Sequence, residues 1–182
     1  MFSDVEIRTI VVRSATDIGH EQFRGVWSLW QERRGGKPLP ARSDFGIEEF
    51  LPWARHIGMF RVEGAVERLV VKLSSSTMID LNRRDVTGCY LDEIVPKGTA
   101  EFIMEPYRLA AMERQAVFHS LVVEEDGRQS GLSALMLPMA ENGCDTDYFA
   151  IALYLNDRIR NPFELTPLRR RLLLQDSAMD TD

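Results

Sequence analysis

Residues 66–95, VERLVVKLSSSTMIDLNRRDVTGCYLDEIV, form the stretch that decides the fold. Apolar and β-branched residues fill 69–73 with the alternation that is typical of a half-buried strand. The run SSST at 74–77 supplies side-chain oxygens that can cap a following helix, and Gly88 favours a turn before a short helix that ends at Pro96. Because a strand followed by short helices against a sheet encloses a concavity, we expect this stretch to line any pocket.

The composition is that of an ordinary globular protein. The chain has 182 residues, of which 45% are hydrophobic and 27% charged, and its formal net charge is −6. This size suits one domain with extensions, and the acidic balance argues against binding to nucleic acid or to an anionic membrane. No apolar run approaches the roughly 18 residues of a membrane span. The first residues, MFSDVEIRTIVVR, carry acids where a secretory signal carries positive charge, so we expect a cytoplasmic protein.

The residue types that most often do chemistry are scarce and scattered. Two cysteines, Cys89 and Cys144, are too few for a disulfide framework and lack the spacing of metal ligands. His20, His56 and His119 lie far apart in the sequence, so we expect no metal site. The sequence contains no GxSxG, HExxH, GxxxxGK[ST] or GxGxxG motif, which leaves the common nucleophile, zinc and phosphate devices without support.

A helix is predicted over 17–34, since its apolar residues recur at spacings of three and four. The apolar stripe consists of Phe23, Val26, Trp27 and Trp30. Two interpretations of this stripe remain open. It covers the sheet of its own domain, or its two tryptophans anchor a homodimer contact, because buried aromatic residues dominate protein interfaces.

The remaining pattern predicts an antiparallel sheet. Expected strands lie at 57–62, 66–73, 117–125, 132–140 and 147–155, with a weaker candidate at 5–13. A longer helix is expected over 98–115, where Pro106 should start or kink a turn. Alternation along 117–125 places His119 on the apolar face of its strand.

The order of these elements resembles the PAS fold, and residues 30–154 resemble a group of bacterial single-domain PAS proteins of poorly known function. The similar motifs are Trp30 to Arg34, Leu39-Pro40-Ala41-Arg42-Ser43-Asp44, Arg84-Asp85-Val86-Thr87-Gly88, Leu91-Asp92-Glu93-Ile94 and Leu137-Pro138-Met139. One departure is the SSST run at 74–77, where a Gly-Thr pair is expected, and it bears on the mouth of the pocket.

The resemblance implies an α+β, PAS-like fold: a five-stranded antiparallel sheet with helices on one face, an N-terminal helical extension and a short C-terminal tail. We expect the extension and its loop over 1–45, the PAS-like domain over 46–156 and the tail over 157–182. A pocket between sheet and helices is expected to be lined by Met78, Leu91, Tyr107, His119 and Leu135. Such a mostly apolar set with two polar groups is typical of a small-molecule site, and equally of a plain core.

Some PAS families hold haem or flavin, and neither cofactor is expected here. Haem needs an axial ligand, for which His119 is the one candidate, and a histidine of the core or pocket wall is the more ordinary interpretation. Light-sensing flavin domains carry an Asn-Cys-Arg-Phe-Leu-Gln run, whereas this chain has Cys89 near a turn without those neighbours. Cys89 is therefore interpreted as a small buried filler.

Three functions follow from this interpretation. The first is a non-catalytic sensory or regulatory PAS module that binds a small apolar or amphipathic molecule or a protein partner, and that signals in trans to a separate protein, as a homodimer. The second is a pure interaction module with a filled core, which docks a partner through the Trp27 and Trp30 stripe or the RRRLLL segment at 169–174. The third is a small α+β enzyme acting on an apolar substrate, with His119 and Tyr107 as acid/base groups, although no base with an orienting partner can be argued from spacing.

Overall fold

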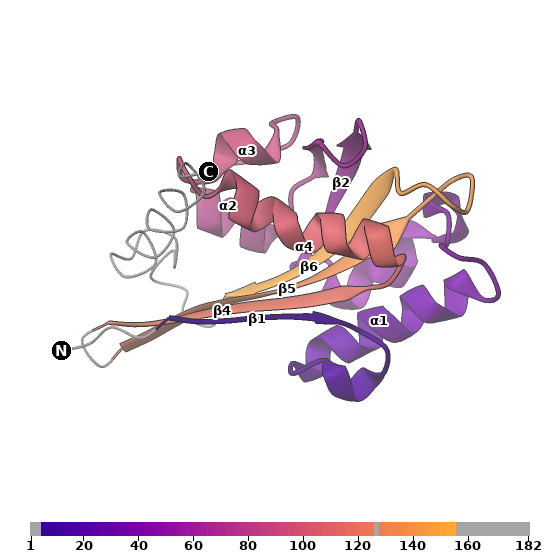
Figure 1. Ribbon diagram of the computed structural model, residues 1–182, viewed down its shortest axis with the longest axis horizontal. Helices are drawn as coiled ribbons and strands as arrows, with labels where there is room; N and C mark the ends of the chain where they lie inside the picture. The colour runs from indigo at the N-terminus through magenta and orange to yellow at the C-terminus, as the bar shows by residue number, and fades with distance from the viewer. Residues whose placement is uncertain (1–4, 126–127, 156–182) are drawn as a thin grey trace, which may run out of the picture.

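A single antiparallel sheet organises the protein (Figure 1). The computed structural model describes residues 5–125 and 128–155. The sheet has six strands in the order β1-β4-β5-β6-β2-β3. The strands are β1 (Val5–Val11), β2 (Ile57–Glu63), β3 (Arg68–Leu73), β4 (Val117–Glu125), β5 (Arg128–Met139) and β6 (Tyr148–Leu155). The α-helices are α1 (Glu21–Arg34), α2 (Ser76–Asn82), α3 (Leu91–Ile94) and α4 (Ala100–Glu113), and the 3₁₀ helices are η1 (Ala15–Asp17), η2 (Arg42–Asp44) and η3 (Ile47–Trp53).

The predicted α+β, PAS-like fold is confirmed, with one strand more than expected. Strands β2 and β3 form a first hairpin, α2, α3 and α4 follow it, and β4, β5 and β6 come last, which is the order that the sequence predicts. The sixth strand, β1, pairs with β4 and extends the sheet at that edge. Its side chains Val5, Ile7 and Val11 pack against the core, which explains why this N-terminal segment joins the sheet.

Helices cover both faces of the sheet, rather than one (Figure 1). On one face, α2, α3 and α4 enclose a cluster that we call the α4-side core, which includes Phe60, Leu69, Val71, Met78, Leu91, Met104, Tyr107, Leu121, Ala134, Phe149 and Ile151. On the other face, α1 and η3 enclose the α1-side core, which includes Phe23, Val26, Trp30, Phe118, Leu135, Leu137, Met139, Ala150, Ala152 and Tyr154, with Trp27 and Trp53 partly buried against it. The predicted N-terminal helix is therefore the cover of the second face.

The apolar stripe of α1 is used within the chain. Phe23 and Val26 are 0% exposed and Trp30 is 1% exposed, all against the α1-side core. The indole Nε1 of Trp30 donates a hydrogen bond to the backbone oxygen of Pro138 at 2.9 Å. Since these three side chains face the sheet, and Trp27 is half-buried beside them, the prediction that this stripe contacts a second copy is corrected to the alternative that it covers its own sheet.

Helix α1 also holds η3 in place. An ideal Cβ at Gly25 would lie 2.6 Å from the Trp53 ring, so the absence of a side chain at Gly25 lets that ring approach the helix backbone. Arg33 near the end of α1 forms an ion pair with Glu49 of η3. Helix α1 ends at Gly35, whose φ of 55° suits glycine.

The central stretch folds as its sequence indicates. The Ser75 hydroxyl caps α2 by accepting a hydrogen bond from the Met78 N–H at 3.1 Å. Gly88 has a φ of +88°, and its N–H donates to the Val71 oxygen at 2.8 Å, while the Val71 N–H donates to the Cys89 oxygen at 2.9 Å. The outer edge of β3 is thus covered by the segment that leads into α3.

Two expectations about helix ends were wrong. Pro106 lies inside α4, which runs without interruption from Ala100 to Glu113, and its side chain is buried. The helix predicted from residue 17 begins only at Glu21, so Asp17 lies before α1. Its carboxylate instead accepts the backbone N–H groups of Arg13 and Ser14, both at 2.8 Å, and these bonds lower its pKa.

No helix in 5–125 and 128–155 is long and apolar enough to cross a membrane. The predicted tail over 157–182, with its RRRLLL segment at 169–174, lies outside the described residues.

Trp30→Phe is expected to lower the free energy of unfolding by about 2 kcal/mol, because it leaves the buried Pro138 carbonyl without its donor and removes part of a buried ring. Urea unfolding followed by circular dichroism measures the change. Trp27→Phe is the matched control, since the Trp27 Nε1 has no partner among the described residues, and its cost should stay below about 1 kcal/mol. Equal costs for the two variants would contradict the account of the stripe.

Candidate ligand cavity

A cavity of about 90 Å³ lies between the sheet and the helices of the α4 side. Its walls come from β2, β4, β5 and β6 below, from α2 and α4, and from α3 with the segment after it. The lining side chains are Phe60, Met78, Leu81, Asn82, Leu91, Ile94, Val95, Pro96, Ile103, Pro106, Tyr107, His119, Leu132, Ala134, Met136, Ile151 and Leu153. All are apolar except the amide, the phenol and the imidazole.

The pleat of the sheet determines which side chains reach the cavity. In the β4–β5 register, His119 lies opposite Ala134, so the two share a face. The methyl group of Ala134 leaves room above the sheet that a longer side chain would fill. On α4, Ile103, Pro106 and Tyr107 are spaced by three and four residues and therefore point the same way.

Four of the five predicted pocket residues line the cavity, namely Met78, Leu91, Tyr107 and His119. Leu135 does not. It pairs with Phe118 and belongs to the α1-side core, because neighbouring residues of a strand point to opposite faces. That the four residues bind a ligand stays a prediction.

Tyr107 places a hydroxyl in the apolar wall. Its side chain is 5% exposed, and its ring meets Phe60 and Phe149 edge to face at centroid distances of 5.9 and 5.3 Å. Burial raises the pKa of Tyr107, so the phenol stays protonated. Aromatic contacts thus fix its ring, and the side chain is one of those that line the cavity.

His119 is the second polar group of the cavity. The residue is 5% exposed, and its Nδ1 lies 2.9 Å from the Thr9 hydroxyl on β1. The ring also meets Phe102 edge to face at 5.7 Å. Burial lowers the pKa of His119 to about 4, which keeps the imidazole neutral at pH 7. Its other nitrogen, Nε2, has no hydrogen-bond partner among residues 5–125 and 128–155.

The arrangement suits binding better than acid–base chemistry. The only polar partner of His119 in the described chain is the Thr9 hydroxyl, so no carboxylate orients its ring as a general base requires. Tyr107 holds its proton more tightly than an ordinary phenol. No Asp, Glu, Lys or Arg among the described residues lines the cavity, so these residues offer a charged molecule no compensation for its desolvation.

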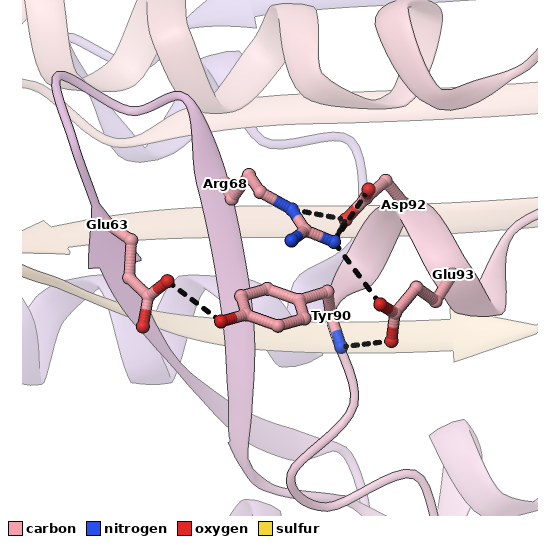
Figure 2. A network of polar contacts seen from close by, with 5 residues as sticks. All are labelled: Glu63, Arg68, Tyr90, Asp92 and Glu93. Atoms are coloured by element: carbon pink, nitrogen blue, oxygen red, sulfur yellow. Dashed lines mark hydrogen bonds and ion pairs between the residues drawn. The ribbon is translucent and has the colours of Figure 1, made fainter.

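A polar network fastens the α3 wall to the sheet (Figure 2). Arg68 of β3 binds both carboxylate oxygens of Asp92 at 2.9 to 3.2 Å and reaches Glu93 at 3.3 Å. Its guanidinium lies 3.6 Å from the centre of the Tyr90 ring. The Tyr90 hydroxyl in turn donates to Glu63 of β2 at 3.0 Å.

Charges in this network support one another. Hydrogen bonds from Arg61 and from Tyr90 lower the pKa of Glu63, and Glu63 raises the pKa of Tyr90. The hydrogen bonds to Asp92 raise the pKa of Arg68. Glu63 therefore stays ionised, and Arg68 and Tyr90 stay protonated, at neutral pH. The network holds Leu91, the residue next to Tyr90, at the cavity wall.

Sequence reasoning did not find this network. Arg68 and Asp92 are 24 residues apart, so no local spacing joins them. Ala134 was missed too, since a small apolar residue in a strand carries no signal of a cavity. The sequence did indicate the α3 wall itself, through the Gly88 turn that precedes this short helix.

Haem and flavin do not fit this cavity. Its volume of about 90 Å³ lies below the roughly 300 Å³ at which ligand pockets begin, and below the roughly 150 Å³ of a cavity that admits benzene. Cys89 is not among the lining residues and packs partly buried at the margin of the α4-side core, near Arg84. Within the described chain, no group of three or more His, Cys, Asp or Glu side chains is placed to hold a metal ion.

No protein-family model matches the sequence, and no curated protein matches it. Among solved structures, that of an RNA-binding Light-Oxygen-Voltage receptor is similar to this chain, with 13% sequence identity and a TM-score of 0.47. The match covers 97% of this chain and 44% of the receptor chain, so this chain spans less than half of the receptor's length. The PAS-like assignment therefore rests on the strand order and on the helices of the α4 side.

Acid is expected to destabilise the protein through His119. The unfolded chain binds a proton below the ordinary histidine pKa of 6.5, whereas the folded state does so only near pH 4. Stability is therefore lost as pH falls from 6.5 to 4, by about 3 kcal/mol in total. Urea unfolding at several pH values should show this slope, and His119→Gln should remove most of it.

His20→Gln is the comparison variant for this titration. Partial burial also lowers the pKa of His20, but this histidine is half-buried beside α1 and away from the cavity. The His20→Gln variant should therefore keep most of the loss of stability between pH 6.5 and 4. An unchanged slope in His119→Gln would show that His119 is not buried as a neutral group.

Proposed function

We propose that the protein is a non-catalytic sensory PAS module that binds a small uncharged molecule in the cavity of the α4 side. Binding changes the packing of the cavity wall, and the change passes to a separate signalling protein in the cytoplasm. The support comes from the cavity itself, from its neutral polar groups and from the PAS-like fold.

The observation that carries the proposal is the pair of neutral polar side chains, Tyr107 and His119, in the otherwise mostly apolar wall of the cavity. A mostly apolar pocket with a few polar groups is the usual composition of a small-molecule site. Burial keeps the phenol of Tyr107 protonated and the imidazole of His119 uncharged at neutral pH, so both are suited to hydrogen bonds with an uncharged ligand.

The cavity also limits the class of ligand. Its walls are mostly apolar and none of the described residues that line it is charged, which favours an uncharged molecule. Its volume of about 90 Å³ favours one smaller than benzene, such as a short alcohol or ketone. A larger ligand requires that the α3 wall move outward, against the network of Arg68 and Asp92.

Two alternatives remain beside this proposal. In a pure interaction module the cavity holds only water and the surface docks a partner, and its small volume favours this alternative. A small enzyme would use His119 and Tyr107 as acid and base, but His119 lacks an orienting carboxylate among the described residues.

Tyr107→Phe is expected to weaken binding of a short alcohol about fivefold, since it removes one hydrogen bond to the ligand. Acetone and 1-propanol are suitable probes, titrated into the full chain and followed by ¹H–¹⁵N NMR. Peaks of cavity residues such as Ala134 and Ile151 should shift in the wild type. Native mass spectrometry of the purified protein complements this by detecting a retained molecule.

The matched control is Tyr154→Phe. Tyr154 is 8% exposed and its hydroxyl has no partner in the described chain, but it belongs to the α1-side core. Both variants should fold at least as stably as the wild type, because neither loses a hydrogen bond of the described chain and Tyr154→Phe removes a buried hydroxyl that has no partner among the described residues. Only Tyr107→Phe should change the titration. Cavity peaks that do not move with any probe would favour the interaction module instead.

A further inference from the structure

A row of polar side chains crosses the sheet from β1 to β6. The strand register places Arg8 of β1 opposite Ser120 of β4, and Ser120 opposite Ser133 of β5. Ser133 in turn lies opposite Tyr154 of β6. Residues that lie directly opposite each other in a sheet project from the same face, so these four side chains stand side by side. We call them the cross-sheet row.

The cross-sheet row faces α1, on the side of the sheet opposite the cavity (Figure 1). Tyr154 belongs to the α1-side core. So do Phe118 and Leu135, which lie two residues from Ser120 and Ser133 along their strands. Because residues two apart in a strand point to the same face, both serine hydroxyls lie on this side. The row therefore runs along the margin of the α1-side core.

The segment that leads into α1 contacts both ends of the cross-sheet row. The imidazole of His20, the residue before the helix, lies 4.7 Å from the Tyr154 ring between centroids, and the Phe23 ring of the first turn lies 4.8 Å from it. An ideal Cβ on Gly19 would lie 4.0 Å from Nη1 of Arg8. The start of α1 thus lies over the row, with the two serines between its ends.

Two buried polar atoms meet at this place without a hydrogen-bond partner among the described residues. They are the hydroxyl oxygen of Tyr154 and the Nδ1 of His20. Tyr154 is 8% exposed, and Ser133 beside it is 6% exposed. A buried polar atom that lacks a partner costs about 1–3 kcal/mol, and such atoms are rare in native proteins unless water, an ion or a ligand meets them. A bound polar group would satisfy both atoms.

Positive charge surrounds these atoms. Arg8 is exposed, and no carboxylate of the described residues forms an ion pair with it, although Glu6 stands two residues away on the same face. The guanidinium of Arg24 donates to the Ile18 oxygen at 3.3 and 3.4 Å and so holds a second positive charge beside the same segment. The start of the 14-residue α1 adds the positive end of its dipole, next to the exposed Glu21. This balance favours an anion.

We propose that the cross-sheet row, together with His20, is a binding site for an oxyanion, the phosphate or carboxylate group of a small molecule. The Arg8 guanidinium binds the oxyanion through two parallel N–H donors, the geometry by which arginine recognises both groups. The hydroxyls of Ser120 and Ser133 donate to its other oxygens. The Tyr154 hydroxyl and the Nδ1 of His20, in the tautomer that carries its proton there, close the inner end of the site.

Inorganic phosphate and sodium acetate are the probes, titrated separately into the full 182-residue chain and followed by ¹H–¹⁵N NMR. Sodium chloride at the same ionic strength is the reference, since it reproduces the screening of surface charges. The amide peaks of Gly19, His20 and Ser133 should shift and saturate with at least one probe. Tighter binding of phosphate would identify the ligand as a phosphate ester, and tighter binding of acetate as a carboxylate.

Arg8→Gln should weaken the binding about tenfold or more, because it removes two charge-assisted hydrogen bonds. Ser133→Ala and Tyr154→Phe should each weaken it roughly three- to fivefold, and both should fold, since each removes only a hydroxyl. Lys72→Gln is the matched control. Lys72 is exposed on β3, the other outer strand, and the loss of its charge should leave the binding unchanged.

Three results would overturn the inference. The first is that no peak of the site moves at about 50 mM of either probe, far above the roughly 1 mM dissociation constant of a weak specific site. The second is that sodium chloride produces the same shifts. The third is that Arg8→Gln and Lys72→Gln weaken the binding equally. Binding of 1-propanol in the cavity should be unchanged in Arg8→Gln, so that failure of this site is distinguishable from failure of the cavity.

Discussion

The pairing of β4 with β5 is the constraint on which the rest of the structure depends. Because His119 lies opposite Ala134, an imidazole and a methyl group share the α4 face, while Phe118 and Leu135 share the other. A shift of one residue would exchange the two faces along both strands and place His119 beneath α1. The cavity, the neutral histidine and the tryptophan-rich cover of the far face all follow from this one register.

Burial then determines the chemistry of the cavity. Tyr107 and His119 are polar groups that low dielectric holds in their neutral forms. The charges of the neighbourhood, those of Glu63, Arg68 and Asp92, lie outside the cavity and act on the α3 wall instead. The protein thus separates two kinds of polar group: neutral groups line the cavity, and charged groups outside hold the wall that encloses it.

Much of the fold was predictable from local pattern, and much of the site was not. Alternation and capping residues located most strands and helices, because the periods of 2 and 3.6 are local properties. Local pattern also placed His119 on the cavity face correctly. It misplaced Leu135, because the phase of β5 relative to β4 is fixed by pairing between strands and not by either strand alone. For the same reason, local pattern could not decide whether the stripe of Phe23, Val26 and Trp30 packs against its own sheet or against a second copy. It also missed the hydrogen bonds between Arg68 and Asp92.

The hydrogen bond between Thr9 and His119 has a thermodynamic consequence. It joins β1, an outer strand of the sheet, to the wall of the cavity. The orientation of the His119 imidazole therefore depends both on the position of β1 and on the contents of the cavity. Where a ligand biases that orientation, its binding free energy is coupled to the pairing of β1 with β4, and the coupling acts equally in both directions. A molecule bound in the cavity would then hold the outermost strand more firmly, and a change at that strand would alter the affinity of the cavity by the same free energy.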